Sequence, residues 1–168
     1  MIISIIYLLL SFVLDSFMSN IFPSTLTDIS YFTTIYIIIA FVIVYPCFIN
    51  EKKYYLLIII FGLLFDILYT GTFIFNMILF LVIGIIIKLF NNIFPSNVIT
   101  TNVVGIIAIS VYHILSFIIL SLVSGISYDF ILLINIILHS ILMTIIYTSI
   151  TYILVKFTYE RLELKEVK

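Results

Sequence analysis

The stretch "YIIIAFVIVY" (36–45) decides the fold class of this chain. It contains no charged residue, and its apolar residues do not alternate with polar ones. A transmembrane β-strand would alternate with a period of two, and a helix on a soluble protein would show a polar face at helical spacing. The segment 73–87 is equally apolar all round. Both segments therefore predict helices that have apolar surroundings on every side.

Composition extends this conclusion to the whole chain. Of its 168 residues, 65% are hydrophobic and only 9% are charged, whereas a soluble domain has about 25% charged residues. So few charges do not cover the surface of a protein in water, and lipid is the expected solvent. The chain is long enough for six spans of about 20 residues with short loops.

Polar interruptions divide the chain into six apolar segments. Asp28 is expected to cap the second helix, and a break at 70–72 divides a segment that would otherwise be too long for one span. We therefore predict an all-α polytopic membrane protein, with a bundle of six transmembrane helices over 1–157 and a short charged tail over 158–168. The expected spans are 2–22, 29–49, 54–69, 72–90, 98–123 and 130–156.

The positions of the basic residues predict the orientation. With six spans, every Lys and Arg falls on one side of the membrane, and the opposite loops contain Asp28 and Asp129 instead. Since basic loops remain in the cytoplasm, we expect both termini to be cytoplasmic. The seven basic residues are Lys52, Lys53, Lys88, Lys156, Arg161, Lys165 and Lys168.

Polar side chains also occur inside the expected spans. An acid within a span costs ~2.5–3.5 kcal/mol on insertion scales, so it usually faces protein or a water-filled cavity. From the direction of each span we expect the acids and amides in the outer half of the membrane and the histidines nearer the middle. This arrangement predicts a polar cluster between helices, in which the acids are protonated, hydrated or paired with a histidine. The residues concerned are Asp15, Asp66, Asn76, His113, Asn135 and His139.

Each of these residues also has a purely structural interpretation. Asp66 either has a functional role or forms a hydrogen bond to a helix end, and Asp15 either joins the cluster or reaches toward the interface. His113 either bonds a neighbouring helix or pairs with an acid. Gly62 lies one helical turn before Asp66, on the same face, and its small size permits close approach of a neighbouring helix.

Signatures of catalysis are missing from the sequence. It contains no H-E-x-x-H, no G-x-S-x-G and no glycine-rich phosphate loop, and Cys47 is its single cysteine. We therefore expect a protein that is not an enzyme and that has no cofactor and no metal site.

The segment "IIIFGLLFDILYTG" (58–71), followed by an apolar span that ends at Lys88, resembles the MreD family of the bacterial rod-shape and cell-elongation complex. Members commonly have a Gly-x-x-x-Asp step in a middle helix, here Gly62 and Asp66, and an acid late in the first span, here Asp15. The length and the six-span layout also agree. The chain departs from the pattern at Ile74, where the family usually has a glycine.

This resemblance implies a non-enzymatic scaffold in the bacterial plasma membrane, which takes part in cell-wall biogenesis, peptidoglycan synthesis and the control of cell shape. Its partners would be MreC and, indirectly, a transpeptidase, a glycan polymerase and the actin-like filament protein, with no nucleic acid. Helix packing or partner binding would then involve Gly62, Asp66, Asp15, Asn76 and His113. The family also looks related to the substrate-binding subunits of energy-coupling-factor vitamin transporters. The alternative is therefore a membrane subunit that binds a small molecule near the outer face.

Overall fold

The computed structural model describes residues 2–21, 34–124 and 130–161, and every regular element in these ranges is helical. A 3-10 turn, η1, continues the second helix, and a π-helical turn, η2, continues the third. The elements are α1 (Ile2–Ile21), α2 (Tyr36–Val44), η1 (Tyr45–Cys47), α3 (Glu51–Phe65), η2 (Asp66–Thr70), α4 (Phe75–Ile93), α5 (Val98–Ser124) and α6 (Phe130–Arg161).

Five of these helical segments are long and apolar enough to cross a membrane. They are α1, α3 together with η2, α4, α5 and α6, and their bounds lie within about five residues of the corresponding expected spans. The outward sides of these helices carry many exposed large apolar side chains, as lipid requires. The chain is thus an all-α polytopic membrane protein, as the composition predicts.

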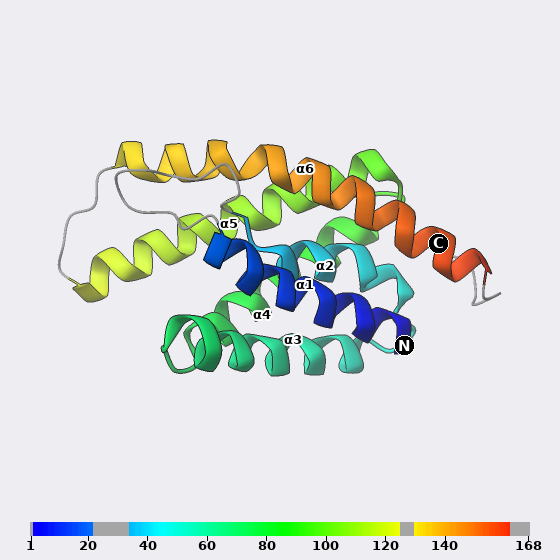
Figure 1. Ribbon diagram of the computed structural model, residues 1–168, viewed down its shortest axis with the longest axis horizontal. Helices are drawn as coiled ribbons and strands as arrows, with labels where there is room; N and C mark the ends of the chain where they lie inside the picture. Colours follow the sequence, from blue (N-terminus) through cyan, green and yellow to red (C-terminus); the bar gives the residue numbers. More distant parts are fainter. Residues whose placement is uncertain (1, 22–33, 125–129, 162–168) are drawn as a thin grey trace.

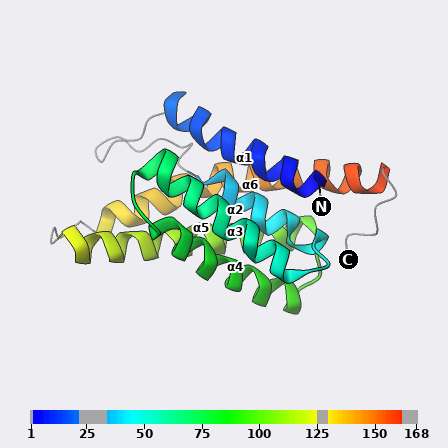
Figure 2. The same cartoon turned by 90° about the horizontal axis from the view of Figure 1, so that it is seen from below.

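The centre of the bundle is α2. All nine of its residues are buried, and it contacts α1, α4, α5 and α6. In Figures 1 and 2 it lies in the middle of the bundle, with the longer helices around it. A helix that is apolar on every side has no face for water, and here its neighbours cover all of it.

The second helix is shorter than the predicted span 29–49. Thr34 and Ile35 are not helical, and α2 begins at Tyr36. With η1 it measures only about 20 Å along its axis, less than the ~30 Å of a bilayer core. Asp28, the expected cap of this helix, lies outside the described residues, and its expected place at the start of the helix is taken by another side chain, described below.

The other helices pack in antiparallel pairs around this centre. α3 pairs with α4, and α5 pairs with α6. At one end of the α3–α4 pair, Lys88 Nζ and Glu51 Oε2 form an ion pair 2.6 Å long. α1 is tied to α6 by three hydroxyl hydrogen bonds, between Ser4 and Tyr159, Tyr7 and Thr158, and Ser11 and Tyr147.

The last helix extends into the segment expected to be the charged tail. The helix α6 continues past residue 157 as far as Arg161, whose guanidinium lies 4.6 Å from the centre of the Phe157 ring. Residues 162–168 lie outside the described part of the chain. The first turn of α1 and the last turn of α6 lie at the same end of the bundle in Figure 1.

We predict that labelling from outside the cell will distinguish the two ends of the bundle. In a Cys47→Ser background, Phe73→Cys places a thiol at the α3–α4 turn, where Phe73 is 80% exposed, and Lys52→Cys places one at the opposite end. A membrane-impermeant maleimide should label the first variant in intact cells, and the second only after the membrane is opened. Labelling of Lys52→Cys in intact cells would show that the protein has the opposite orientation in the membrane.

Candidate functional site

Asp66 lies at the junction of α3 and η2, and its side chain reaches across to the beginning of α4. It is fully buried. Its Oδ1 accepts hydrogen bonds from the backbone N–H of Asn76 at 2.9 Å, from the side-chain amide of Asn76 at 2.9 Å and from the Thr72 hydroxyl. Its Oδ2 accepts from the backbone N–H of Met77 at 3.2 Å. Both carboxylate oxygens are therefore used within the chain.

These bonds place Asp66 in the role of a helix cap. The first N–H groups of a helix have no partner inside it, and an N-cap side chain normally accepts from the second or third residue of the helix. The N-cap position of α4 is Ile74, which makes no side-chain cap bond. A carboxylate from the preceding helix takes its place, and its negative charge also suits the positive end of the helix dipole.

The cap is extended into a network that joins three helices. The side-chain amide of Asn76 also donates to Thr70 Oγ1 at 3.1 Å, and its Oδ1 accepts from the Tyr112 hydroxyl of α5 at 2.7 Å. Asn76 is fully buried, and its side chain bonds Asp66 and Thr70 of η2 and Tyr112 of α5. Sequence reasoning did not single out Tyr112, since a tyrosine within a span is indistinguishable from the many packing aromatics of this chain.

Two residues in the left-handed region let the chain turn back over Asp66. Gly71 has φ of 62° and Ile74 has φ of 67°. Glycine adopts this conformation freely, but a β-branched side chain does so rarely. Ile74 is the position where the MreD-like pattern has glycine, so the backbone keeps a conformation that suits glycine although the side chain does not.

Gly62 brings the two helices of this turn into contact. A Cβ atom built on Gly62 would lie 2.6 Å from the Cα atom of Met77, a distance that real side chains do not reach. The backbone of α4 therefore passes directly over Gly62, and the N–H of the same Met77 is capped by Asp66. Close packing and capping thus act on one junction between α3 and α4.

Asp15 caps the start of α2 in the same way as Asp66 caps the start of α4. Its Oδ1 accepts from the backbone N–H of Tyr36 at 2.7 Å and its Oδ2 from that of Ile37 at 3.0 Å. The N-cap residue of α2, Ile35, makes no side-chain cap bond. The pair α1–α2 and the pair α3–α4 therefore share one plan, in which an acid late in the first helix caps the second helix.

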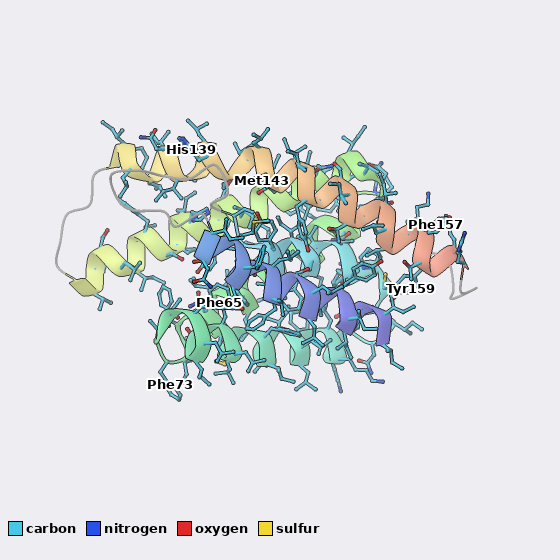
Figure 3. All side chains as sticks on the ribbon, in the orientation of Figure 1. Phe65, Phe73, His139, Met143, Phe157 and Tyr159 are labelled. Carbon is cyan, nitrogen blue, oxygen red and sulfur yellow. The ribbon has the colours of Figure 1, made fainter. Side chains whose placement is uncertain are left out.

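The capped pairs α1–α2 and α3–α4 also contact each other. The Tyr69 hydroxyl of η2 donates to the carbonyl oxygen of Phe12 at 2.6 Å, and the two rings lie 4.8 Å apart. Figure 3 shows Phe65 between α1 and α3, and Phe73 projecting away from the bundle beside the α3–α4 turn.

The structure brings together only part of the expected polar cluster, because Asp66 and Asn76 bond each other whereas Asp15 bonds the start of α2. The described contacts of both acids are with N–H and hydroxyl groups near helix starts, and pairing with a histidine, one of the three alternatives expected for the acids, is not among them. His113 lies on α5, and no hydrogen bond reaches its Nε2 from the described residues. His139 bonds the carbonyl of Asn135 within α6, and Asn135 is exposed. Each acid instead accepts hydrogen bonds from the N–H groups at the start of a helix that has no capping side chain of its own. These bonds take the place of a positively charged partner.

No known protein family, curated protein or solved structure matches this chain. The role of Asp15 and Asp66 therefore follows from the geometry of their hydrogen bonds. The carboxylates accept hydrogen bonds from the chain's own backbone, which makes each acid a cross-link between two consecutive helices.

We predict that Asp66→Leu will lower the free energy of unfolding by about 2–4 kcal/mol, because it leaves buried backbone and amide N–H groups without an acceptor. Asp66→Asn keeps one acceptor oxygen and should lose less. The measurement is unfolding by sodium dodecyl sulfate in mixed micelles, followed by circular dichroism. Glu160→Gln, which removes an exposed carboxylate on α6, is the matched control and should leave stability unchanged. Equal stability of Asp66→Leu and this control would refute the capping role.

We predict that Ile74→Gly, in contrast, will raise the free energy of unfolding. Relief of the left-handed conformation of a β-branched residue should exceed the added flexibility of the unfolded chain, for a gain of up to about 1 kcal/mol in unfolding free energy. Ile78→Gly, one turn later on the exposed face of α4, should instead lose about 1 kcal/mol. The same unfolding assay checks both variants, and a loss at position 74 as large as that at 78 would show that the turn stores no strain.

Proposed function

We propose that this chain is a non-enzymatic scaffold subunit of a bacterial cell-wall elongation complex, similar to MreD, located in the plasma membrane with both termini in the cytoplasm. In this proposal it binds the single-span protein MreC. Through MreC it acts with a transpeptidase and a glycan polymerase on cell shape and peptidoglycan synthesis, and on the cytoplasmic side with the actin-like filament protein.

The observation that supports this proposal best is the α3–α4 junction. Gly62 and Asp66 are the residues on which the resemblance to MreD depends, and they meet the same stretch of α4, at Met77. The Asp66 carboxylate accepts four hydrogen bonds from groups of the chain itself, at the start of α4 and in the turn before it. Such a junction suits a protein that holds a fixed surface for a partner better than one that performs chemistry.

The outer end of this junction offers a surface of suitable chemistry. Phe73 is 80% exposed, and Ile67 and Leu68 are 65% and 62% exposed. Large aromatic and aliphatic side chains are common anchors at interfaces. In this proposal they contact MreC where its membrane span emerges on the outer side.

The alternative is a vitamin-binding subunit of an energy-coupling-factor transporter. A polar metabolite needs several free hydrogen-bonding groups in its pocket. In this chain Asp15, Asp66 and Asn76 bond to backbone and side-chain groups of the protein itself. A metabolite would have to displace these bonds, so the geometry favours the scaffold.

Affinity capture from native membranes, followed by mass spectrometry, tests the proposal. The wild-type chain should retain MreC, and Phe73→Ala should retain less because it removes an exposed anchor. Phe157→Ala, the matched control at the opposite end of the bundle, should retain as much MreC as wild type. Capture of a transporter coupling subunit together with a bound metabolite, without MreC, would replace the scaffold by the alternative.

A further inference from the structure

A second site lies between α5 and α6, away from the capping network. It is a pocket of about 270 Å³. His113, Ser116, Phe117 and Leu120 line it from α5, at the i, i+3, i+4 and i+7 spacing of a single helix face, and Leu133 and Ile136 line it from α6. Almost all of its wall is hydrocarbon.

Two polar atoms of this pocket have no hydrogen bond. Among the described residues, nothing bonds His113 Nε2 or Ser116 Oγ, although both atoms are inaccessible to solvent. The Tyr112 hydroxyl donates to Asn76 and also lies close to Ser116 Oγ, without a hydrogen bond of regular geometry between the two hydroxyls. A buried polar group without a partner is unfavourable, so these two atoms, and His113 Nε2 above all, indicate a ligand with a hydrogen-bonding group.

The pocket selects the chemistry of this ligand. Imidazole and hydroxyl groups both donate or accept, which suits a neutral oxygen such as a hydroxyl, ester or carboxylic acid group. No Lys or Arg lines the pocket, so it offers nothing to a charged head group. Its volume lies below the ~300 Å³ at which sites for drug-sized ligands begin, and a single narrow chain fits it better than a folded metabolite.

The bilayer is the source of such a chain. Leu120 at the pocket and Ile118 beside it are 48% and 47% exposed on a helix that faces lipid.

We propose that this pocket binds one hydrocarbon chain of a membrane lipid, with a neutral oxygen of that lipid at His113 Nε2 and Ser116 Oγ. The proposal does not depend on the scaffold function, since it uses no residue of the α3–α4 junction.

Photo-crosslinking in vesicles of phosphatidylethanolamine and phosphatidylglycerol tests it. Three probes with a diazirine in the chain separate the possible sources: a fatty acid, a long-chain alcohol and a diacyl phosphatidylethanolamine. At least one probe should concentrate its cross-links in 113–120 and 132–136, relative to the lipid-facing part of α3. Leu133→Trp, which fills the pocket, should remove this enrichment, and Leu138→Trp, which adds the same ring on the exposed side of α6, should leave it. Uniform cross-linking by all three probes, or no effect of Leu133→Trp, would refute the proposal.

His113→Leu separates a ligand-binding histidine from a structural one. It should weaken the enrichment by about fivefold, the equivalent of one net hydrogen bond. The same variant should be at least as stable as wild type in the detergent unfolding assay, because it removes an orphan polar atom from an apolar wall. A clear loss of stability with unchanged cross-linking would show that His113 serves the fold and not a ligand.

Discussion

The structure depends on how the unpaired backbone N–H groups at the start of each helix find hydrogen-bond acceptors inside a membrane. Each helix begins with N–H groups that its own turns leave unpaired, and the bilayer core has no water to bond them. In this chain the N-cap positions of α2 and α4 are Ile35 and Ile74, which have no side-chain acceptor. Asp15 and Asp66 supply the acceptor from the helix before, and the cost of placing an acid in the membrane is offset by two hydrogen bonds or more for each carboxylate.

This constraint also explains the shape of the α3–α4 turn. For Asp66 to face the start of α4, the chain must reverse within a few residues, and Gly71 and Ile74 both adopt left-handed conformations to do so. Gly62 permits the backbones to meet one turn earlier. The close contact, the turn and the cap therefore depend on one another. The sequence resemblance to MreD lies in the same segment, and for that reason the proposed scaffold function is tied to it.

Much of the architecture follows from composition and spacing. The apolar segments predict the helical membrane fold, and "YIIIAFVIVY" predicts a helix with apolar surroundings on every side, which in α2 are its neighbouring helices. The late start of α2 was not predictable from local signals, because the acceptor at its start is Asp15, 21 residues before Tyr36, and not a capping residue next to the helix. A useful signal exists in retrospect: an acid late in one span, followed by a helix whose N-cap position is isoleucine. The bond from Tyr112 to Asn76 has no such signal, since it joins positions on two helices whose relative rotation only the fold determines.

The burial of α2 has a consequence for biogenesis. This helix contacts α5 and α6 as well as α1 and α4, yet it is synthesised before most of them. It is also too short to cross the bilayer as an independent segment. Most of the helices that cover α2 are therefore absent while it enters the membrane, and a chain that ends before α6 leaves part of the central helix uncovered.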